Sequence, residues 1–134
     1  MKKVNNGFSL IEVLVTVAII AIMSTLLLPS VIGRLYSSKV IAVKSDLSTL
    51  NLALDMYKLD NGRYPTTAQG LNALLIQPNN TPHWHTHGYI RGLPIDPFGN
   101  SYVYNNASEN ITIYSRGADG HNGGTGENID IYLD

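Results

Sequence analysis

The sequence predicts an α+β fold in which one long N-terminal helix lies against a small antiparallel sheet. Two observations predict the helix: an apolar run over residues 8–28 whose single charge is Glu12, and a helical apolar stripe farther along the chain. Three short segments, near residues 102–104, 111–114 and 129–132, are rich in strand-forming residues. Three short strands under one long helix make an α+β domain with a meander-like sheet.

The apolar run has the length of a membrane span. As a helix rising about 1.5 Å per residue, residues 8–28 reach roughly 30 Å, the thickness of a bilayer core. Lys2 and Lys3 precede the run and favour a cytoplasmic N-terminus. A cleaved secretory signal peptide is disfavoured, because the run is too long and no small-x-small cleavage site follows. A simple signal anchor explains everything except Glu12, which costs about 2.5–3.5 kcal/mol to insert without a partner.

The helical pattern resumes after a weak point at Pro29 and Gly33. Seven apolar positions at helical spacing form one stripe: Tyr36, Val40, Val43, Leu47, Leu50, Leu54 and Tyr57. The stripe suits either a helix that covers its own domain or an intermolecular coiled coil, and we favour the former. The predicted helix runs from Ser9 to Asp60, about 75 Å long, and ends where Gly62 takes a left-handed conformation.

The segment after the long helix is mostly irregular. Ala68–Leu75 is predicted to be a short helix capped by Thr66 or Thr67. The prolines and glycine of residues 94–100 predict a turn before the first strand.

Three histidines alternate along the segment before that turn. In an extended chain, His83, His85 and His87 would point the same way and offer a metal face. No acidic residue lies beside them, so a solvated loop is the favoured interpretation.

The C-terminal loop, residues 115–130, has five glycines in sixteen residues and needs a reason to be ordered. Its hard oxygen ligands are the side chains of Asp119, Asn122, Glu127, Asn128 and Asp130. Calcium takes six to eight oxygens, including backbone carbonyls that glycines help to present. From the residues alone, a calcium site and a flexible surface loop remain open alternatives. A phosphate loop would need a lysine and a following helix, and the spacing does not fit an EF-hand.

Composition narrows the class of protein further. Outside the apolar run, the 134-residue chain has room for one small domain. Its net charge of −1 and its scattered basic residues argue against nucleic-acid binding. The chain has no cysteine, so a bound ion is a more natural brace for a small exported domain than a disulfide.

The stretch Gly7-Phe8-Ser9-Leu10-Ile11-Glu12 resembles the processing site of type IV pilin-like proteins. The resemblance implies that a prepilin peptidase cuts after Gly7 and that the new Phe8 amine is methylated. It also implies an assembly role for Glu12, whose carboxylate would be neutralised by the α-amine of a neighbouring subunit in a filament.

A second resemblance covers most of the chain. Residues 54–71, 88–90, 93–94, 96–100 and 117–120 are similar to the major pseudopilins of type II secretion, the general secretion pathway protein G family. This family binds calcium in the C-terminal loop through aspartates and main-chain carbonyls.

Carried over by position, the family's ligands fall on Asp119, the carbonyl of Arg116, and Asp130, with Glu127 or Asn128 as alternatives to the last. Two features depart from the family: Phe98 replaces the usual Trp, and the chain ends in residues 131–134 without the usual Gly-Asn-Trp.

The resemblance implies three parts: a leader over residues 1–7, a transmembrane and polymerisation helix over 8–30, and a periplasmic domain over 31–134. The expected function is that of the major subunit of a periplasmic pseudopilus, which drives folded exoproteins through the outer-membrane secretin and catalyses no reaction. The implied partners are copies of the chain, minor pseudopilins, a prepilin peptidase, the secretin, and an inner-membrane assembly platform driven by an ATPase.

Two other functions fit the sequence less well. A type IV pilus pilin for adhesion or twitching usually carries a C-terminal disulfide, which this chain lacks. A membrane-anchored hydrolase using His83, His85 or His87 would need a nucleophile or a metal carboxylate nearby, and the sequence offers no distinctive one.

Overall fold

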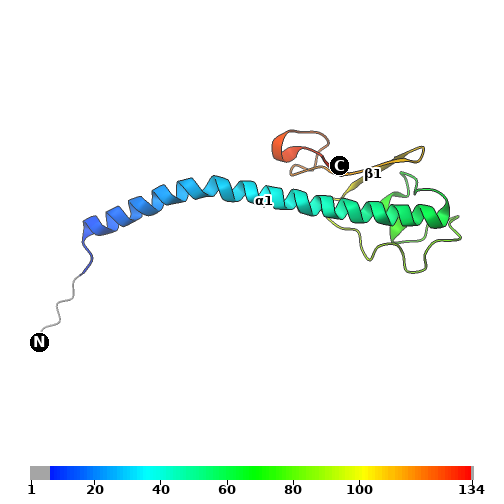
Figure 1. Ribbon diagram of the computed structural model, residues 1–134, viewed down its shortest axis with the longest axis horizontal. Coiled ribbons are helices and arrows are strands. Elements are labelled where there is room, and N and C mark those ends of the chain that lie inside the picture. Colours follow the sequence, from blue (N-terminus) through cyan, green and yellow to red (C-terminus); the bar gives the residue numbers. More distant parts are fainter. Residues whose placement is uncertain (1–6, 134) are drawn as a thin grey trace, which may run out of the picture. The chain divides into compact units, whose positions relative to one another are not determined.

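The computed structural model describes residues 7–133, apart from the side chains of residues 26–32 (Figure 1). Most of the predicted leader, residues 1–6, therefore lies outside the described residues. The chain divides into two compact units, Met1–Ser37 and Ser38–Asp134. The long helix α1, Leu10–Asn61, belongs partly to each unit, and its bounds agree with the predicted helix to within one residue.

In the first unit, α1 begins directly after Ser9, whose carbonyl accepts hydrogen bonds from the backbone N–H groups of Glu12 and Val13. The backbone stays helical through Pro29 and Gly33, so the helix is not interrupted at the predicted weak point. A proline removes only one intrahelical hydrogen bond, and three strong helix-forming leucines, residues 26–28, precede it.

The apolar side chains of the first unit are open to solvent in the single chain. Every large apolar side chain from Phe8 to Met23 is more than half exposed. Within the described part of the chain, no helix meets both the length and the hydropathy required for crossing a bilayer. The predicted span over residues 8–30 includes residues 26–30, whose side chains are not described.

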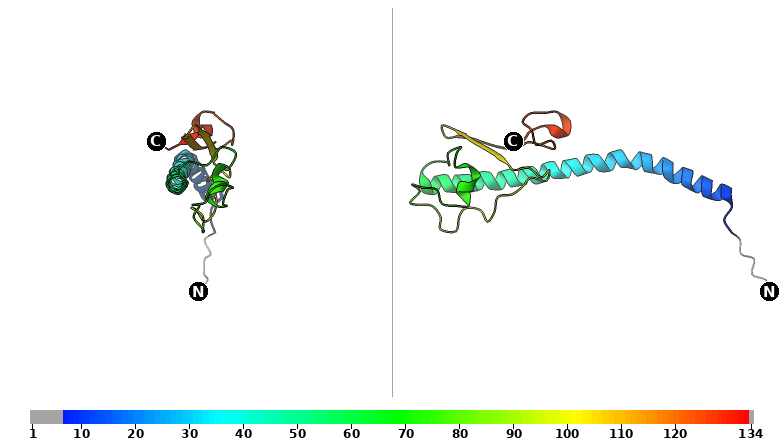
Figure 2. Two further views of the ribbon diagram at one scale, coloured as in Figure 1. Left: turned by 90° about the vertical axis from the view of Figure 1, so that its right-hand side faces the viewer. Right: turned by 180° about the vertical axis from the view of Figure 1, so that it is seen from behind.

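The second unit has one hydrophobic core, built on its half of α1. The predicted stripe is confirmed there, because Val43, Leu47, Leu50, Leu54 and Tyr57 are fully buried. They pack with Leu71 and Leu74, with Tyr102, Tyr104 and Ile113 of the sheet segment, and with Ile131. Seen along the helix, the sheet and loops of this unit gather on one side of α1 (Figure 2, left). The stripe therefore covers its own domain.

The end of α1 is set by Gly62. Its φ of +76° is left-handed, and its N–H donates to the Lys58 carbonyl at 2.8 Å, so the predicted glycine cap is confirmed. Thr66 and Gln69 then bond reciprocally, each side-chain oxygen accepting the backbone N–H of the other residue. This pair precedes η1, Gly70–Leu74. The predicted helix over 68–75 is thus a shorter 3₁₀ helix, because Gly70 has a φ of +60° that an α-helix does not accept.

The predicted antiparallel meander is confirmed. Strand β1 spans Val103–Ala107, β2 spans Asn110–Ser115, and β3 spans Ile131–Tyr132, in the order β1-β2-β3. Ser108 and Glu109, both with positive φ, form the two-residue hairpin turn between β1 and β2. The last strand begins two residues later than predicted, because the 3₁₀ helix η2, Gly126–Asn128, occupies the preceding chain.

The two departures from the family pattern are accommodated within the second unit. Tyr132 pairs with Tyr114 of β2 and stacks on its ring at a centroid distance of 4.9 Å. The ammonium group of Lys39 lies 4.9 Å from the centre of the Phe98 ring. The unusual C-terminus therefore still completes the sheet.

Candidate functional site

The predicted processing junction lies just before α1. Gly7, Phe8 and Ser9 are non-helical and exposed, with Phe8 82% exposed. A peptidase binds its substrate as extended chain, so a junction outside the helix suits cleavage. Glu12 is exposed in the first turn, where its negative charge also interacts favourably with the helix dipole.

The C-terminal loop joins β2 to β3 and carries the two aspartates. One side-chain oxygen of Asp119 accepts the N–H of His121 at 3.0 Å. In Asp130, Oδ2 accepts the N–H of Gly123 at 2.9 Å. The other oxygen, Asp130 Oδ1, is buried, and no donor among the described residues reaches it. A buried carboxylate oxygen without a donor is costly unless a cation pairs with it.

The two ends of the loop lie against each other through their backbones. The N–H of Ala118 donates to the Glu127 carbonyl at 3.1 Å. Gly117, with a φ of +66°, packs so closely that a Cβ there would lie 2.6 Å from the Ile129 carbonyl oxygen. The backbone of Asn128 is approached in the same way by Gly117 and Gly124. These glycines therefore allow close approach to the main-chain carbonyls of residues 128 and 129, which lie between Asp119 and Asp130 in the sequence.

Each predicted ligand has a definite place in this loop. The Arg116 side chain donates through Nε to Asn122 Oδ1 at 3.1 Å, and since a guanidinium has no acceptor, only the Arg116 carbonyl can bind a cation. Glu127 and Asn128 lie on η2, and Asp119 and Asp130 lie at opposite ends of the loop.

A calcium ion fits this donor set, because carboxylate and carbonyl oxygens are its preferred ligands. Across residues 7–133, no three His, Cys, Asp or Glu side chains form a group that could hold a metal ion. A site of two aspartates and main-chain carbonyls requires no such group.

A second set of polar residues forms hydrogen bonds at the start of the C-terminal loop. Its role was not predicted from the sequence. Asp96 is 3% exposed and Ser115 is fully buried, and the Ser115 hydroxyl donates to Asp96 Oδ2 at 2.5 Å. The side-chain amide of Asn100 donates to the Gly117 carbonyl at 3.1 Å. The sequence shows residues 96–100 only as a turn, although Asp and Asn within it are the residue types that bond to nearby backbone.

The three histidines lie on an exposed turn, in agreement with the solvated loop that the sequence favours over a metal face. His83, His85 and His87 are exposed, and none of them belongs to a metal-binding group within the described residues. The His85 ring lies 6.0 Å from the His87 ring, and the His87 N–H donates to His85 Nδ1 at 3.4 Å. A local turn, rather than an extended strand, therefore orients these rings.

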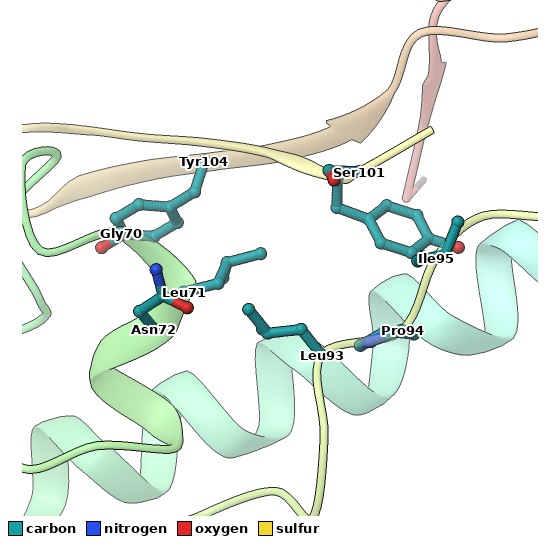
Figure 3. A pocket seen from close by; sticks show the side chains of 9 residues that line it. Gly70, Leu71, Asn72, Leu93, Pro94, Ile95, Ser101 and Tyr104 are labelled. Atoms are coloured by element: carbon teal, nitrogen blue, oxygen red, sulfur yellow. The ribbon is translucent and has the colours of Figure 1, made fainter. Parts of the chain in front are cut away.

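A hollow of about 470 Å³ lies between η1 and the chain entering β1 (Figure 3). Leu71 and Leu93 extend into it and Tyr104 lies along its upper side in this view, and Tyr102 is also among the lining residues. Its walls mix apolar and polar groups, and neither aspartate of the C-terminal loop lines it. We assign no catalytic chemistry to it.

A long N-terminal helix, an exposed Gly-Phe junction with an acid four residues later, and a small three-stranded sheet define a pilin-like protein. Residues 2–28 match the model of the prokaryotic N-terminal methylation motif. Residues 30–134 match the model of type II secretion system protein G, and the chain belongs to this family.

The relatives agree over nearly the full length. The chain is 42% identical to the type II secretion system core protein G of Pseudomonas aeruginosa, over 97% of this chain and 95% of the relative. It is also 42% identical to that of Vibrio cholerae, over 98% of this chain and 94% of the relative. The crystal structure of the major pseudopilin from the type 2 secretion system of enterohaemorrhagic Escherichia coli matches with a TM-score of 0.63 and 42% identity, covering 74% of this chain and 90% of that chain.

These findings confirm the family and the fold predicted from the sequence. Members of this family are structural subunits of secretion machinery. Membership in it, together with the methylation motif, implies a membrane-anchored protein that faces the periplasm.

Proposed function

We propose that the chain polymerises through α1 as the major subunit of a type II secretion pseudopilus. The exposure of every large apolar side chain from Phe8 to Met23 supports this proposal. Apolar surface of this extent requires lipid or another chain to cover it, at about 25 cal/mol per Å² buried. Lipid would cover this surface while residues 8–30 are inserted in the membrane before assembly, and neighbouring helices would cover it in the filament.

The chain would work by assembly rather than catalysis, with a prepilin peptidase acting at Gly7–Phe8. The inner-membrane platform, minor pseudopilins and secretin are the partners that such an assembly requires. Growth of the pseudopilus in the periplasm would then push folded exoproteins through the outer membrane.

Glu12 would set the register of assembly. Once the leader is removed, Phe8 carries a positively charged α-amine, and the next basic group along the chain is Arg34. The Phe8 amine of a neighbouring helix is therefore the natural partner for the Glu12 carboxylate. Breaking such a pair in an apolar environment costs about 3–5 kcal/mol, because one charge is left without a partner.

Glu12→Gln tests this role, because it keeps the shape of the side chain and removes the charge. We expect few filaments by electron microscopy, with a folded periplasmic domain reported by the fluorescence of Trp84, the one tryptophan. Thr16→Ala, one helical turn away, is the control and should assemble normally. Abundant regular filaments from Glu12→Gln would contradict the register role.

We also propose that the C-terminal loop binds calcium through the carboxylates of Asp119 and Asp130 and the carbonyl of Arg116, with Glu127 or Asn128 as alternative ligands. The buried, donor-free Asp130 Oδ1 supports this assignment. Bound calcium would supply positive charge between the two ends of the loop and stabilise the domain by RT ln(1 + [Ca²⁺]/Kd).

Thermal melting of the full-length chain in detergent, with calcium chloride or with a chelator, tests the calcium proposal. We expect calcium to raise the Tm, and Asp130→Asn to abolish most of the increase. Glu109→Gln removes an exposed acid at the distant hairpin turn and should leave the increase unchanged. An equal Tm of the unmodified chain in calcium and in chelator would contradict calcium binding by the loop.

A further inference from the structure

Asp96 uses both of its carboxylate oxygens, although a turn requires only one. Its Oδ1 accepts the backbone N–H groups of Phe98 and Asn100, at 3.0 and 2.7 Å, which holds the turn. Its Oδ2 accepts the hydroxyl of Ser115, nineteen residues farther along the chain. Since a buried carboxylate is costly to desolvate, this second bond calls for an explanation beyond the turn itself.

The Ser115 hydroxyl links Asp96 to the start of the C-terminal loop. Because its proton is committed to the Asp96 carboxylate, its lone pairs face the other way, and one accepts the Gly117 N–H at 3.2 Å. The Asn100 amide donates to the carbonyl of the same glycine. Both backbone groups of Gly117 are therefore held by side chains that the 96–100 turn positions.

These bonds fix the direction of the peptide group before Gly117. Every described peptide bond is trans, so the Gly117 N–H and the Arg116 carbonyl point in opposite directions. With the N–H aimed at Ser115, the Arg116 carbonyl points away from the Asp96–Ser115 pair.

Gly120 adds a second contact to the same support. A Cβ at Gly120 would lie 2.7 Å from Asn100 Oδ1, so the loop packs closely on the Asn100 side chain. Asn100 thus contacts the loop on both sides of Asp119.

We propose that Asp96, Ser115 and Asn100 are positioning residues for the calcium site. They hold the Arg116–Gly117 and Gly117–Ala118 peptides in the orientation that binding requires before the ion arrives. This inference rests on the proposed calcium function. Its alternative is a purely structural role, in which the same bonds stabilise the fold equally with and without calcium.

Calcium titration of the full-length chain in detergent separates the two roles. We expect Ser115→Ala and Asn100→Ala to weaken calcium binding at least tenfold, the usual effect of removing groups that orient metal ligands. At saturating calcium, a tenfold weaker Kd reduces the calcium-induced stabilisation by about 1.4 kcal/mol. Asn100→Ala, at a half-buried position, serves as the decisive variant if Ser115→Ala fails to fold.

Two controls match these variants. Ser101→Ala removes an exposed hydroxyl immediately after the turn and should bind calcium normally. Ile113→Val trims the core on β2 and should lower the Tm equally in calcium and in chelator.

The outcomes are distinct. If the unmodified chain responds to calcium and the Ser115 and Asn100 variants keep its Kd while losing Tm equally in both conditions, their role is structural and the inference is wrong. If the unmodified chain does not respond to calcium, the calcium proposal and this inference both fail. Weakened binding in the variants with normal binding in Ser101→Ala supports the positioning role.

Discussion

Gly117→Ala perturbs the point where the two ends of the C-terminal loop meet. Gly117 is buried with a φ of +66°. A methyl group there would lie 2.6 Å from the Ile129 carbonyl oxygen and 3.0 Å from the Asn128 carbonyl carbon. Both atoms belong to the backbone, so no side-chain rotation can relieve the contact.

Two costs add in this variant. A left-handed conformation costs an alanine about 1–2 kcal/mol. Normal carbon–oxygen contacts begin at about 3.3 Å, so the backbone of residues 128–129 must also move. Overpacking of this kind typically costs about 1–3 kcal/mol. The expected loss is about 2–5 kcal/mol, and each kcal/mol lowers the Tm of a small domain by about 4–8 °C.

Two other glycines separate these costs. Gly126 has a φ of +63° but open space around its missing Cβ, so Gly126→Ala should lose only the conformational part, about 1–2 kcal/mol. Gly92 has open space and no positive φ, so Gly92→Ala should be neutral or stabilising by about 0.4–1 kcal/mol.

Thermal melting followed by Trp84 fluorescence measures all three variants, because the Trp84 indole donates to the Ala73 carbonyl and reports on the second unit. Gly117→Ala should also lose part of the calcium-induced increase in Tm, since it disturbs the Arg116–Gly117 peptide, which carries the proposed carbonyl ligand. Equal losses in Gly117→Ala and Gly126→Ala would show that the close backbone approach has no energetic effect, and would refute the reasoning.

Two further variants test the core of the second unit. Tyr102 donates to Asp46 at 2.8 Å, and burial, together with that bond, raises the pKa of its hydroxyl above the ordinary value of about 10. Its contribution is therefore complete below pH 10 and declines above it, so Tyr102→Phe should lose about 1.5–3 kcal/mol at pH 7 and less at pH 11, measured by urea unfolding. Leu54→Ala, at a fully buried position, should lose about 2–5 kcal/mol, whereas Leu59→Ala, at a position 83% exposed, should change stability by less than about 0.5 kcal/mol. A constant Tyr102 effect across pH, or equal effects of the two leucines, would contradict these assignments.

The features that the sequence predicted are those that local chemistry decides. The apolar stripe from Val43 to Tyr57 predicts the helix and offers one face for burial, and Gly62 sets the helix end through its own conformational freedom. The support under the loop was not predictable in this way, because Asp96 and Ser115 meet only when the turn packs against the end of β2. Asp96 lies in a turn and Ser115 in a strand nineteen residues later, so no helical or strand periodicity could predict that they meet.

Helix α1 shows why a periodic pattern alone does not decide burial. A second set of apolar residues at helical spacing lies opposite the buried stripe and is 49–83% exposed: Ile41, Leu52, Met56 and Leu59. Spacing places both sets on helix faces equally well, since a helix of 3.6 residues per turn can carry an apolar stripe on either side. The sheet decides between them, because Tyr102, Tyr104 and Ile113 fill one side only. The buried face of α1 therefore follows from contacts made some fifty residues later in the chain, such as the Tyr102–Asp46 bond across 56 positions.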